Sequence, residues 1–190
     1  MSLDTFSDAT NGYLVDDSCL FGIQVSAVKH TGNGETLKMN IRNPKQVTFN
    51  WKICKFSKRR RRTPHVVKII SQEFTVGNHK WRLWLYPNGD SGVKDSLSLY
   101  LELVLAPSTV KKVIAEYSLE IQNQISKSHH QKRASVWFNT TKSNVTTSNW
   151  GWPKFILLSD LENESSGFRQ KDTVLIQAKV NIKTEVTYFS

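Results

Sequence analysis

A strict alternation over residues 97–103 limits the fold of this chain more than any other feature. Leucine occupies positions 97, 99, 101 and 103, and Ser98, Tyr100 and Glu102 lie between them. Successive side chains of a β-strand point to opposite faces of the sheet, so the leucines share one face and the other three residues share the opposite one. The stretch therefore predicts a strand with a buried leucine face, and it predicts that Tyr100 points away from the core.

Further runs of alternating or β-branched residues follow one another from residue 49 onward, with turn-forming residues between them. With the leucine stretch these segments are FNWKICKF, HVVKIISQEFTV, KWRLWLYP, LSLYLELVL, VIAEYSLEIQN, RASVWF, KFILL and DTVLIQAKVNI. No amphipathic helical pattern of comparable strength interrupts them. Strands at this spacing predict an all-β fold, an eight-stranded antiparallel β-sandwich. Trp51, Trp81 and Trp84 lie within these strands, where packing is the usual role of a large aromatic ring.

One internal repeat sets the expected domain boundaries. Residues 12–25, GYLVDDSCLFGIQV, align without a gap on residues 167–180, GFRQKDTVLIQAKV, at an offset of 167 − 12 = 155. Both copies have a glycine, an aromatic residue, an aspartate, a serine or threonine, and then an apolar run that ends in valine. We expect an orphan strand of a preceding repeat, a polar linker, one complete domain and a short tail, over residues 1–28, 29–46, 47–184 and 185–190 respectively.

The positive charge belongs to the complete domain. The chain carries +10, and residues 1–40 carry two lysines against five acidic residues, which leaves +13 for residues 41–190. Ten basic residues and no acidic one lie between Arg42 and Lys68, with a peak at KRRRR: Lys58, Arg59, Arg60, Arg61 and Arg62. Adjacent cations repel one another, so we expect a solvated loop there. This cluster can attract nucleic acid, acidic proteins or the nuclear-import machinery. It can equally be a loop that is only solvated, and the sequence leaves these alternatives open.

Other classes of function find little support in the sequence. The adjacent histidines 129 and 130 do not have the spacing of a helical metal pair, and no phosphate-binding glycine loop or nucleophile elbow occurs. We therefore expect no catalytic residue, no metal and no cofactor. The two cysteines, Cys19 and Cys54, lack the paired spacing of a zinc site and are expected to be free thiols. Without signal-peptide or membrane-span features, we expect a cytoplasmic protein, with nuclear import through the basic run as an alternative.

Six segments together resemble the MATH domain, also called the TRAF-homology domain, over about residues 47–184. They are FNWKICKFS, KWRLWLYPNGD, DSLSLYLEL, AEYSLEIQNQ, NWGWPKFILLSDL and GFRQKDTVLIQAKV. The sequence of these segments is most similar to that of plant MATH proteins with tandem domains, which agrees with the internal repeat. The resemblance implies a TRAF-like eight-stranded sandwich that binds partner proteins and catalyses nothing.

The resemblance also implies a shallow groove for an extended peptide. Carried over to this chain, the groove residues are Tyr100, Tyr117, Val136, Phe138, Trp150 and Trp152. The alternation argues for Tyr100 as a surface residue, whereas Tyr117 shares its parity with Val113, Ala115 and Leu119 and is expected to be buried. Val136 replaces a tyrosine of the peptide-binding members, and Ser148 and Asn149 replace a Lys-Asp pair, so the peptide is expected to differ.

Two functions from different classes follow. The first is a protein-interaction module of adaptor type. Its expected partner is a client protein, a ubiquitin-pathway component or another MATH chain, and its oligomeric state is open. The second is a nucleic-acid binder that uses the cluster from Arg42 to Lys68. We favour the first, because charge alone gives non-specific, salt-sensitive binding and because no stacking aromatics interleave with KRRRR.

Overall fold

The computed structural model describes residues 1–22, 34–39, 46–61, 68–90, 92–106, 108, 110–140 and 148–189. Its strands are β1 (Gly34–Met39), β2 (Gln46–Cys54), β3 (Ile69–Ile70), β4 (Phe74–Val76), β5 (His79–Tyr86), β6 (Ser96–Leu105), β7 (Val110–Ile121), β8 (His130–Asn139), β9 (Asn149–Leu157), β10 (Arg169–Gln170) and β11 (Thr173–Phe189). Its helices are α1 (Leu3–Ser7), α2 (Phe56–Arg61) and α3 (Leu158–Glu162), with 3-10 turns η1 (Ala9–Asn11) and η2 (Glu164–Ser166). The chain divides into two compact units, Met1–Gly32 and Asn33–Ser190. None of the described helices is long and apolar enough to cross a membrane.

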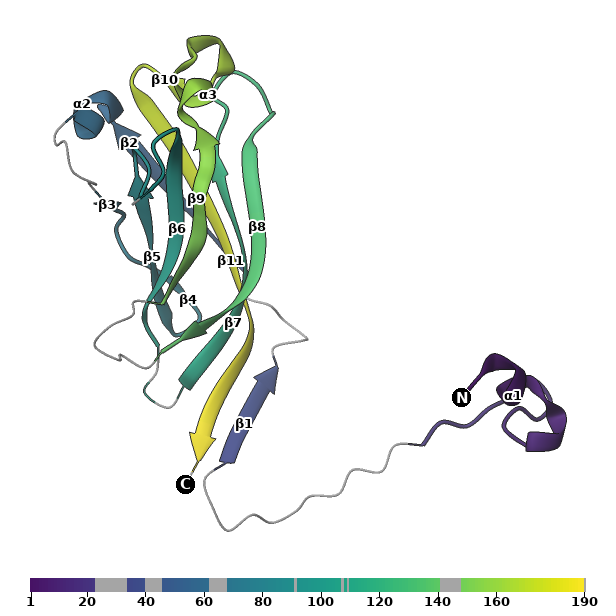
Figure 1. Ribbon diagram of the computed structural model, residues 1–190. Coiled ribbons are helices and arrows are strands. Elements are labelled where there is room, and N and C mark those ends of the chain that lie inside the picture. Colours follow the sequence, from purple (N-terminus) through teal and green to yellow (C-terminus); the bar gives the residue numbers. More distant parts are fainter. Residues whose placement is uncertain are drawn as a thin grey trace. The chain divides into compact units, whose positions relative to one another are not determined.

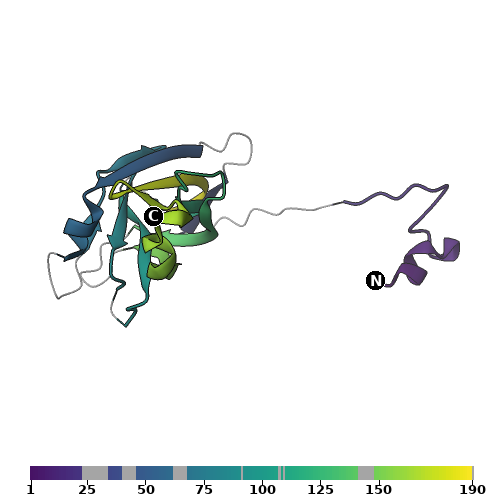
Figure 2. The same ribbon diagram turned by 90° about the horizontal axis from the view of Figure 1, so that it is seen from above.

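The larger unit is a sandwich of two antiparallel sheets (Figure 1). One sheet has the strand order β1-β11-β7-β8, and β2 and β10 also pair with β11. The other sheet has the order β3-β5-β6-β9, and β4 also pairs with β5. Figure 2, which looks down the strands, shows the two layers facing each other. The predicted antiparallel β-sandwich is confirmed. The predicted segment HVVKIISQEFTV contains two short strands, β3 and β4, and β10 is a further short strand that was not predicted.

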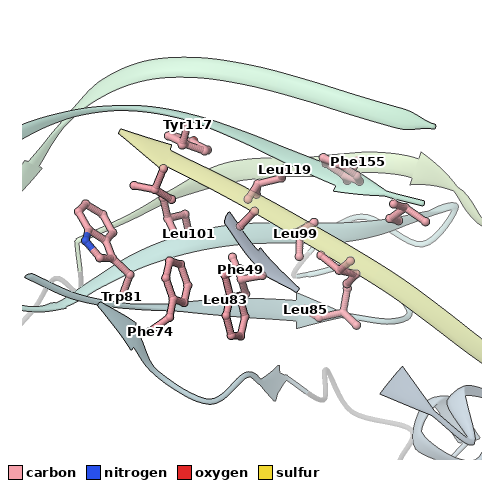
Figure 3. Close-up of a cluster of buried hydrophobic side chains, with 14 of the residues drawn as sticks. Phe49, Phe74, Trp81, Leu83, Leu85, Leu99, Leu101, Tyr117, Leu119 and Phe155 are labelled. Atoms are coloured by element: carbon pink, nitrogen blue, oxygen red, sulfur yellow. The ribbon is translucent and has the colours of Figure 1, made fainter. Parts of the chain in front are cut away.

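The core lies between the inner faces of the two sheets, as the leucine alternation predicts. The leucines at 97, 99 and 101 are completely buried, and β6 pairs Leu99 and Leu101 with the equally buried Leu85 and Leu83 of β5. Figure 3 shows Leu83, Leu85, Leu99 and Leu101 among aromatic side chains that include Phe74, Tyr117 and Phe155. Burial of such side chains removes apolar surface from water and supplies the main stabilising free energy of the sandwich.

Two of the expected boundaries differ from the structure. Residues 34–39, inside the expected linker, form β1, which pairs with the C-terminal half of β11 from Gly34↔Phe189 to Met39↔Thr184. Residues 185–189 of the expected tail likewise belong to β11, where Thr184 and Val186 are buried beyond a bulge after Ile182. Sequence reasoning missed β1 because the described side chains along it are largely exposed, which leaves no apolar alternation to detect.

The solvated loop expected for KRRRR is also wrong, because Lys58–Arg61 lie in helix α2; Arg62 falls outside the described residues. A helix turns each successive side chain by about 100°, which separates adjacent cations. Arg60 also forms an ion pair with Glu162 and donates a hydrogen bond to the Asn88 side chain. These partners offset the repulsion between neighbouring basic residues.

The smaller unit contains α1, η1 and an isolated bridge between Val15 and Ser18. Residues 19–22 of the expected orphan strand have no regular secondary structure, and the rest of that stretch, to residue 28, lies outside the described residues. Large apolar side chains are exposed here, among them Leu20 at 99% and Phe21 at 80%. Both free cysteines, Cys19 in this unit and Cys54 at the end of β2, are exposed as well.

Candidate functional site

The two sheets each end in an edge strand at the same side of the sandwich, and β8 and β9 lie next to each other there (Figure 1). We call the line between them the β8–β9 seam. Side chains bridge it near both ends. His130 Nε2 lies 2.6 Å from the Phe155 carbonyl oxygen, and Lys132 Nζ donates to the Lys154 carbonyl. At the opposite end, the Asn139 amide donates to Ser148 Oγ at 2.9 Å.

Two tryptophans stand at this second end of the seam. Trp150 of β9 is 50% exposed, and its Nε1 donates a hydrogen bond across the seam to the carbonyl oxygen of Trp137, at 2.9 Å. Trp137 of β8 is itself 42% exposed. The bond holds the Trp150 indole in place, so the ring presents a fixed apolar surface to solvent. Sequence reasoning did not select Trp137, because its parity is opposite to that of Val136 and Phe138, which were assigned to the groove; the burial of Phe138 shows that Trp137 faces outward instead.

Tyr117 and Phe138, by contrast, lie in the core. Tyr117 is 2% exposed and Phe138 is completely buried, and their ring centroids are 6.1 Å apart. Burial raises the pKa of Tyr117. Figure 3 shows Tyr117 among the core side chains. The groove role implied for these two residues is therefore not available to them in this structure, because both point inward from β7 and β8.

Trp152 and Val136 occupy an intermediate position beneath the seam. Both are half-buried and pack against the core. The Trp152 ring lies 5.7 Å from Tyr117 and 5.9 Å from Phe155, measured between centroids. Trp150 and Trp152 lie two residues apart on β9, so both side chains point to the same side of that strand.

Tyr100 lies on the outer face of the five-stranded sheet, opposite the leucines, as the alternation predicts. Its hydroxyl donates to the Asp90 carboxylate, and its ring meets that of Tyr86 edge-on, with centroids 6.0 Å apart. Burial, and next the hydrogen bond to Asp90, raise the pKa of Tyr100, so the hydroxyl stays protonated at neutral pH. The ring is only partly exposed.

Gly151 is the neighbour of Tyr100 on β9. The two residues are Cα partners in the β6–β9 ladder, next to a bulge. A Cβ atom at position 151 would lie 2.1 Å from the Leu99 carbonyl oxygen and 2.5 Å from the Tyr100 Cα, so only glycine allows this close approach. Because glycine has no side chain, nothing at position 151 separates Tyr100 from the free edge of β9.

The structure thus divides the residues selected from the sequence into three groups. Trp150, Trp152 and Val136 line the seam, Tyr100 lies on the outer face behind Gly151, and the remaining two are core residues. We refer to Trp137, Val136, Trp150, Trp152 and Tyr100 as the seam surface. Among the described residues, no group of histidine, cysteine and acidic side chains could hold a metal ion.

The described residues of the basic cluster make contacts within the domain. Arg59 Nε donates to the Cys54 carbonyl at 3.3 Å, and Arg60 is engaged with Glu162 and Asn88. Lys68 places its ammonium 3.3 Å from the centre of the Trp84 ring, a cation–π contact. These contacts use part of the cluster to stabilise the domain itself.

Comparison with known proteins identifies the family of this sandwich. The family model for the MATH domain matches residues 48–180. The chain is 33% identical to ubiquitin C-terminal hydrolase 12 of Arabidopsis thaliana over 150 residues, which cover 78% of this chain and 12% of the hydrolase. It is 34% identical, over 139 residues, to a MATH domain and coiled-coil domain-containing protein of Arabidopsis thaliana; the match covers 70% of this chain and 38% of that protein.

A solved structure shows the same fold. TRAF5 of Notothenia coriiceps superposes with a TM-score of 0.58 at 22% sequence identity, covering 70% of this chain and 72% of that chain. The chain spans well under half of the length of the two curated relatives above, and the hydrolase match lies in the MATH region, so their complete activities do not transfer with it. MATH domains are protein-interaction modules and are generally non-catalytic. The match over most of the sandwich shows that this chain belongs to the MATH domain family.

Proposed function

We propose that the sandwich binds an extended segment of a partner protein along the β8–β9 seam, with the seam surface supplying the side-chain contacts. The observation that carries this proposal is that two edge strands meet at the seam beside exposed, fixed tryptophans. Edge strands offer unpaired backbone groups to an added strand. Peptides that bind in this way gain main-chain hydrogen bonds, and pockets for alternate side chains give the specificity.

The direction of the backbone groups along β8 supports this mode of binding. The Trp137 carbonyl and the Asn139 amide both face β9, as their bonds to Trp150 and Ser148 require. In a strand, residues two apart direct their backbone groups to the same side, so Arg133 and Ser135 also direct theirs toward the seam. An incoming segment can pair with these groups in the middle of the seam, between the two bridged ends.

The side chains around that middle part suit an apolar residue of the partner. Val136 and Trp152 are half-buried there, and the exposed Trp150 ring adjoins them. Tyr100 is reached across Gly151 by a segment that follows the edge of β9. Since such a contact area is small, we expect modest affinity and transient recognition, as befits an adaptor.

The relatives support the choice of partner class. Two of them are named ubiquitin C-terminal hydrolases, and one is a RING finger protein of Dictyostelium discoideum. We propose that the partners of this chain include components of ubiquitin-dependent turnover, which are recognised here without catalysis by this chain.

The test is a binding titration with a segment mapped from a partner that the full chain captures. Trp150→Ala and Tyr100→Ala are each expected to weaken binding about thirtyfold if the residue is a hot spot, which corresponds to roughly 2 kcal/mol. Ile70→Ala is the matched control, because Ile70 is a partly exposed apolar residue on β3, at the opposite edge of the same sheet. Its affinity should equal that of the parent chain.

Thermal melts of the same variants separate lost contacts from lost folding. Variants that melt as the parent chain does and still bind the segment with unchanged affinity would show that the partner uses another surface. Trp150→Phe separates the contribution of the aromatic ring from that of its hydrogen bond, because it keeps an aromatic ring and removes the bond to the Trp137 carbonyl oxygen.

A further inference from the structure

Residues 3–18 repeat the local structure of residues 158–173 at the offset of 155 residues. Helices α1 and α3 begin at Leu3 and Leu158, and the turns η1 and η2 begin at Ala9 and Glu164. The same offset separates the Val15↔Ser18 bridge from the Gln170↔Thr173 pair between β10 and β11. The sequence repeat is therefore also a repeat of conformation.

The hydrogen bonds at the helix ends repeat as well. Asp8 Oδ1 accepts from the Thr10 amide at 2.9 Å, and Asn163 Oδ1 accepts from the Ser165 amide at 3.0 Å. The amides of Asp8 and Asn163 donate back into their helices, to carbonyl oxygens of residues 4 and 159, each at 3.1 Å. An aspartate or asparagine at a turn can make one such bond by chance, but a matching set in the same order is specific.

The backbone reversals match in the same way. Gly12 and Gly167 end η1 and η2 with φ of 67° and 80°. The turn residues Asp16 and Asp17 have φ of 48° and 57°, against 48° and 55° for Lys171 and Asp172. Two successive positive φ values characterise the tight hairpin turn that leads into a right-handed twisted strand. Residues 3–18 thus hold the conformation that opens β11 in the complete domain.

The two copies differ in burial. In the complete domain, Leu158, Leu161 and Ile176 are 8%, 0% and 1% exposed, respectively. The first and last of their counterparts, Leu3 and Phe21, are 81% and 80% exposed. Cys19, the counterpart of the fully buried Val174, is also exposed. Exposed apolar side chains gathered on one short segment mark an interaction surface.

The counterparts of Asp17 and Gly12 show which contacts these two positions make in the complete domain. Asp172, the counterpart of Asp17, accepts hydrogen bonds from the Ser57 amide at 2.9 Å and from Ser57 Oγ at 2.7 Å, which fasten the turn to helix α2. Gly167 likewise leaves room for Asn123, whose Oδ1 would lie 2.2 Å from a Cβ at that position. Gly12 has no atom within 4 Å of the equivalent position. Asp172 and Gly167 thus contact other parts of the complete domain, and Asp17 and Gly12 hold the equivalent positions of the repeated turn.

We propose that residues 3–22 are a docking element that closes a second MATH-type sandwich, whose other strands correspond to residues 46–157 of this chain. The repeat identifies the partner of residues 3–22 as a sandwich of the same type, because a segment with the same conformation and the same apolar positions fits the same inner face. Leu3, Phe6 and Phe21 would take the places of Leu158, Leu161 and Ile176, and Asp17 would bond the residue equivalent to Ser57.

The first test is a segment exchange in the full chain, with residues 158–177 replaced by residues 3–22. Cys19→Ser and Cys54→Ser at the original positions leave a single thiol, at position 174. We expect a cooperative thermal transition and a rate of thiol labelling at least about a hundredfold below that of Cys19 in the parent chain, because labelling of a core thiol requires opening of the sandwich. A control exchange with the same residues in scrambled order should give neither result. An authentic exchange that behaves like the scrambled one overturns the proposal.

The second test supplies the proposed partner sandwich within the same chain. Residues 46–157 are fused directly ahead of Leu3 in a full chain that carries Cys54→Ser in both copies. Cys19 should become protected from labelling to a similar degree, and Asp17→Ala should lower that protection, while the same substitution leaves the melt of the parent chain unchanged. If Cys19 labels as fast as in the parent chain, residues 46–157 do not form its partner and the proposal fails.

Discussion

The leucine face of β6 gives the most direct test of the fold, through the substitution Leu101→Ala. Leu101 is completely buried, with Leu83 of β5 on one side and Trp150 of β9 on the other as its ladder partners. Removing a buried leucine side chain costs its transfer free energy and leaves a cavity that the neighbours only partly fill. We expect a loss of about 2–5 kcal/mol in the free energy of unfolding, which corresponds to a fall in Tm of roughly 4–20 °C.

Leu37→Ala provides the matched control, because it is the same substitution at a residue that is 54% exposed on β1. Surface substitutions of this kind usually change stability by no more than about 0.5 kcal/mol. Urea unfolding measures both values, and an unchanged slope with denaturant indicates that the folded and unfolded states keep their compactness. Equal losses for the two variants would refute the assignment of the leucine face to the core.

Three further predictions concern other parts of the domain. Gly151→Ala should destabilise the sandwich by about 1–3 kcal/mol, because the added Cβ would lie 2.1 Å from the Leu99 carbonyl oxygen; a melt identical to that of the parent chain would contradict the close approach of β6 and β9. Burial lowers the pKa of His79, against the opposing effect of Glu185 at 3.6 Å. The unfolded chain therefore binds the proton more readily, stability is complete above about pH 6.5 and declines as the pH falls below it, and His79→Gln should flatten this part of a Tm profile. Finally, any binding of the basic cluster to nucleic acid should weaken steeply between low and physiological salt and show no sequence preference in a titration; selective binding at physiological salt would favour the nucleic-acid function instead.

Much of the domain can be predicted from the sequence because the side-chain period of a strand is a property of the chain itself. The alternation around Tyr100 placed four leucines in the core and the tyrosine on the outer face, and both placements are confirmed. The same parity argument indicated that Tyr117 is buried, in conflict with the groove role implied by the resemblance, and the structure agrees with the parity. The offset of 155 residues predicted an orphan strand, whereas the described part of that stretch instead repeats the turn that precedes β11.

Tertiary structure decided what depends on contacts between distant parts of the chain. No local sequence pattern predicted β1 or α2. Strand β1 forms through its pairing with β11, and Arg60 of α2 forms an ion pair with Glu162, which is distant in the sequence. The seam has the same origin. Its edge strands belong to different sheets, and only their meeting brings the Trp150 indole to the Trp137 carbonyl. Local periodicity tells which way a side chain faces, but the order of strands in a sheet, and therefore which edges stay free, is set by non-local pairing.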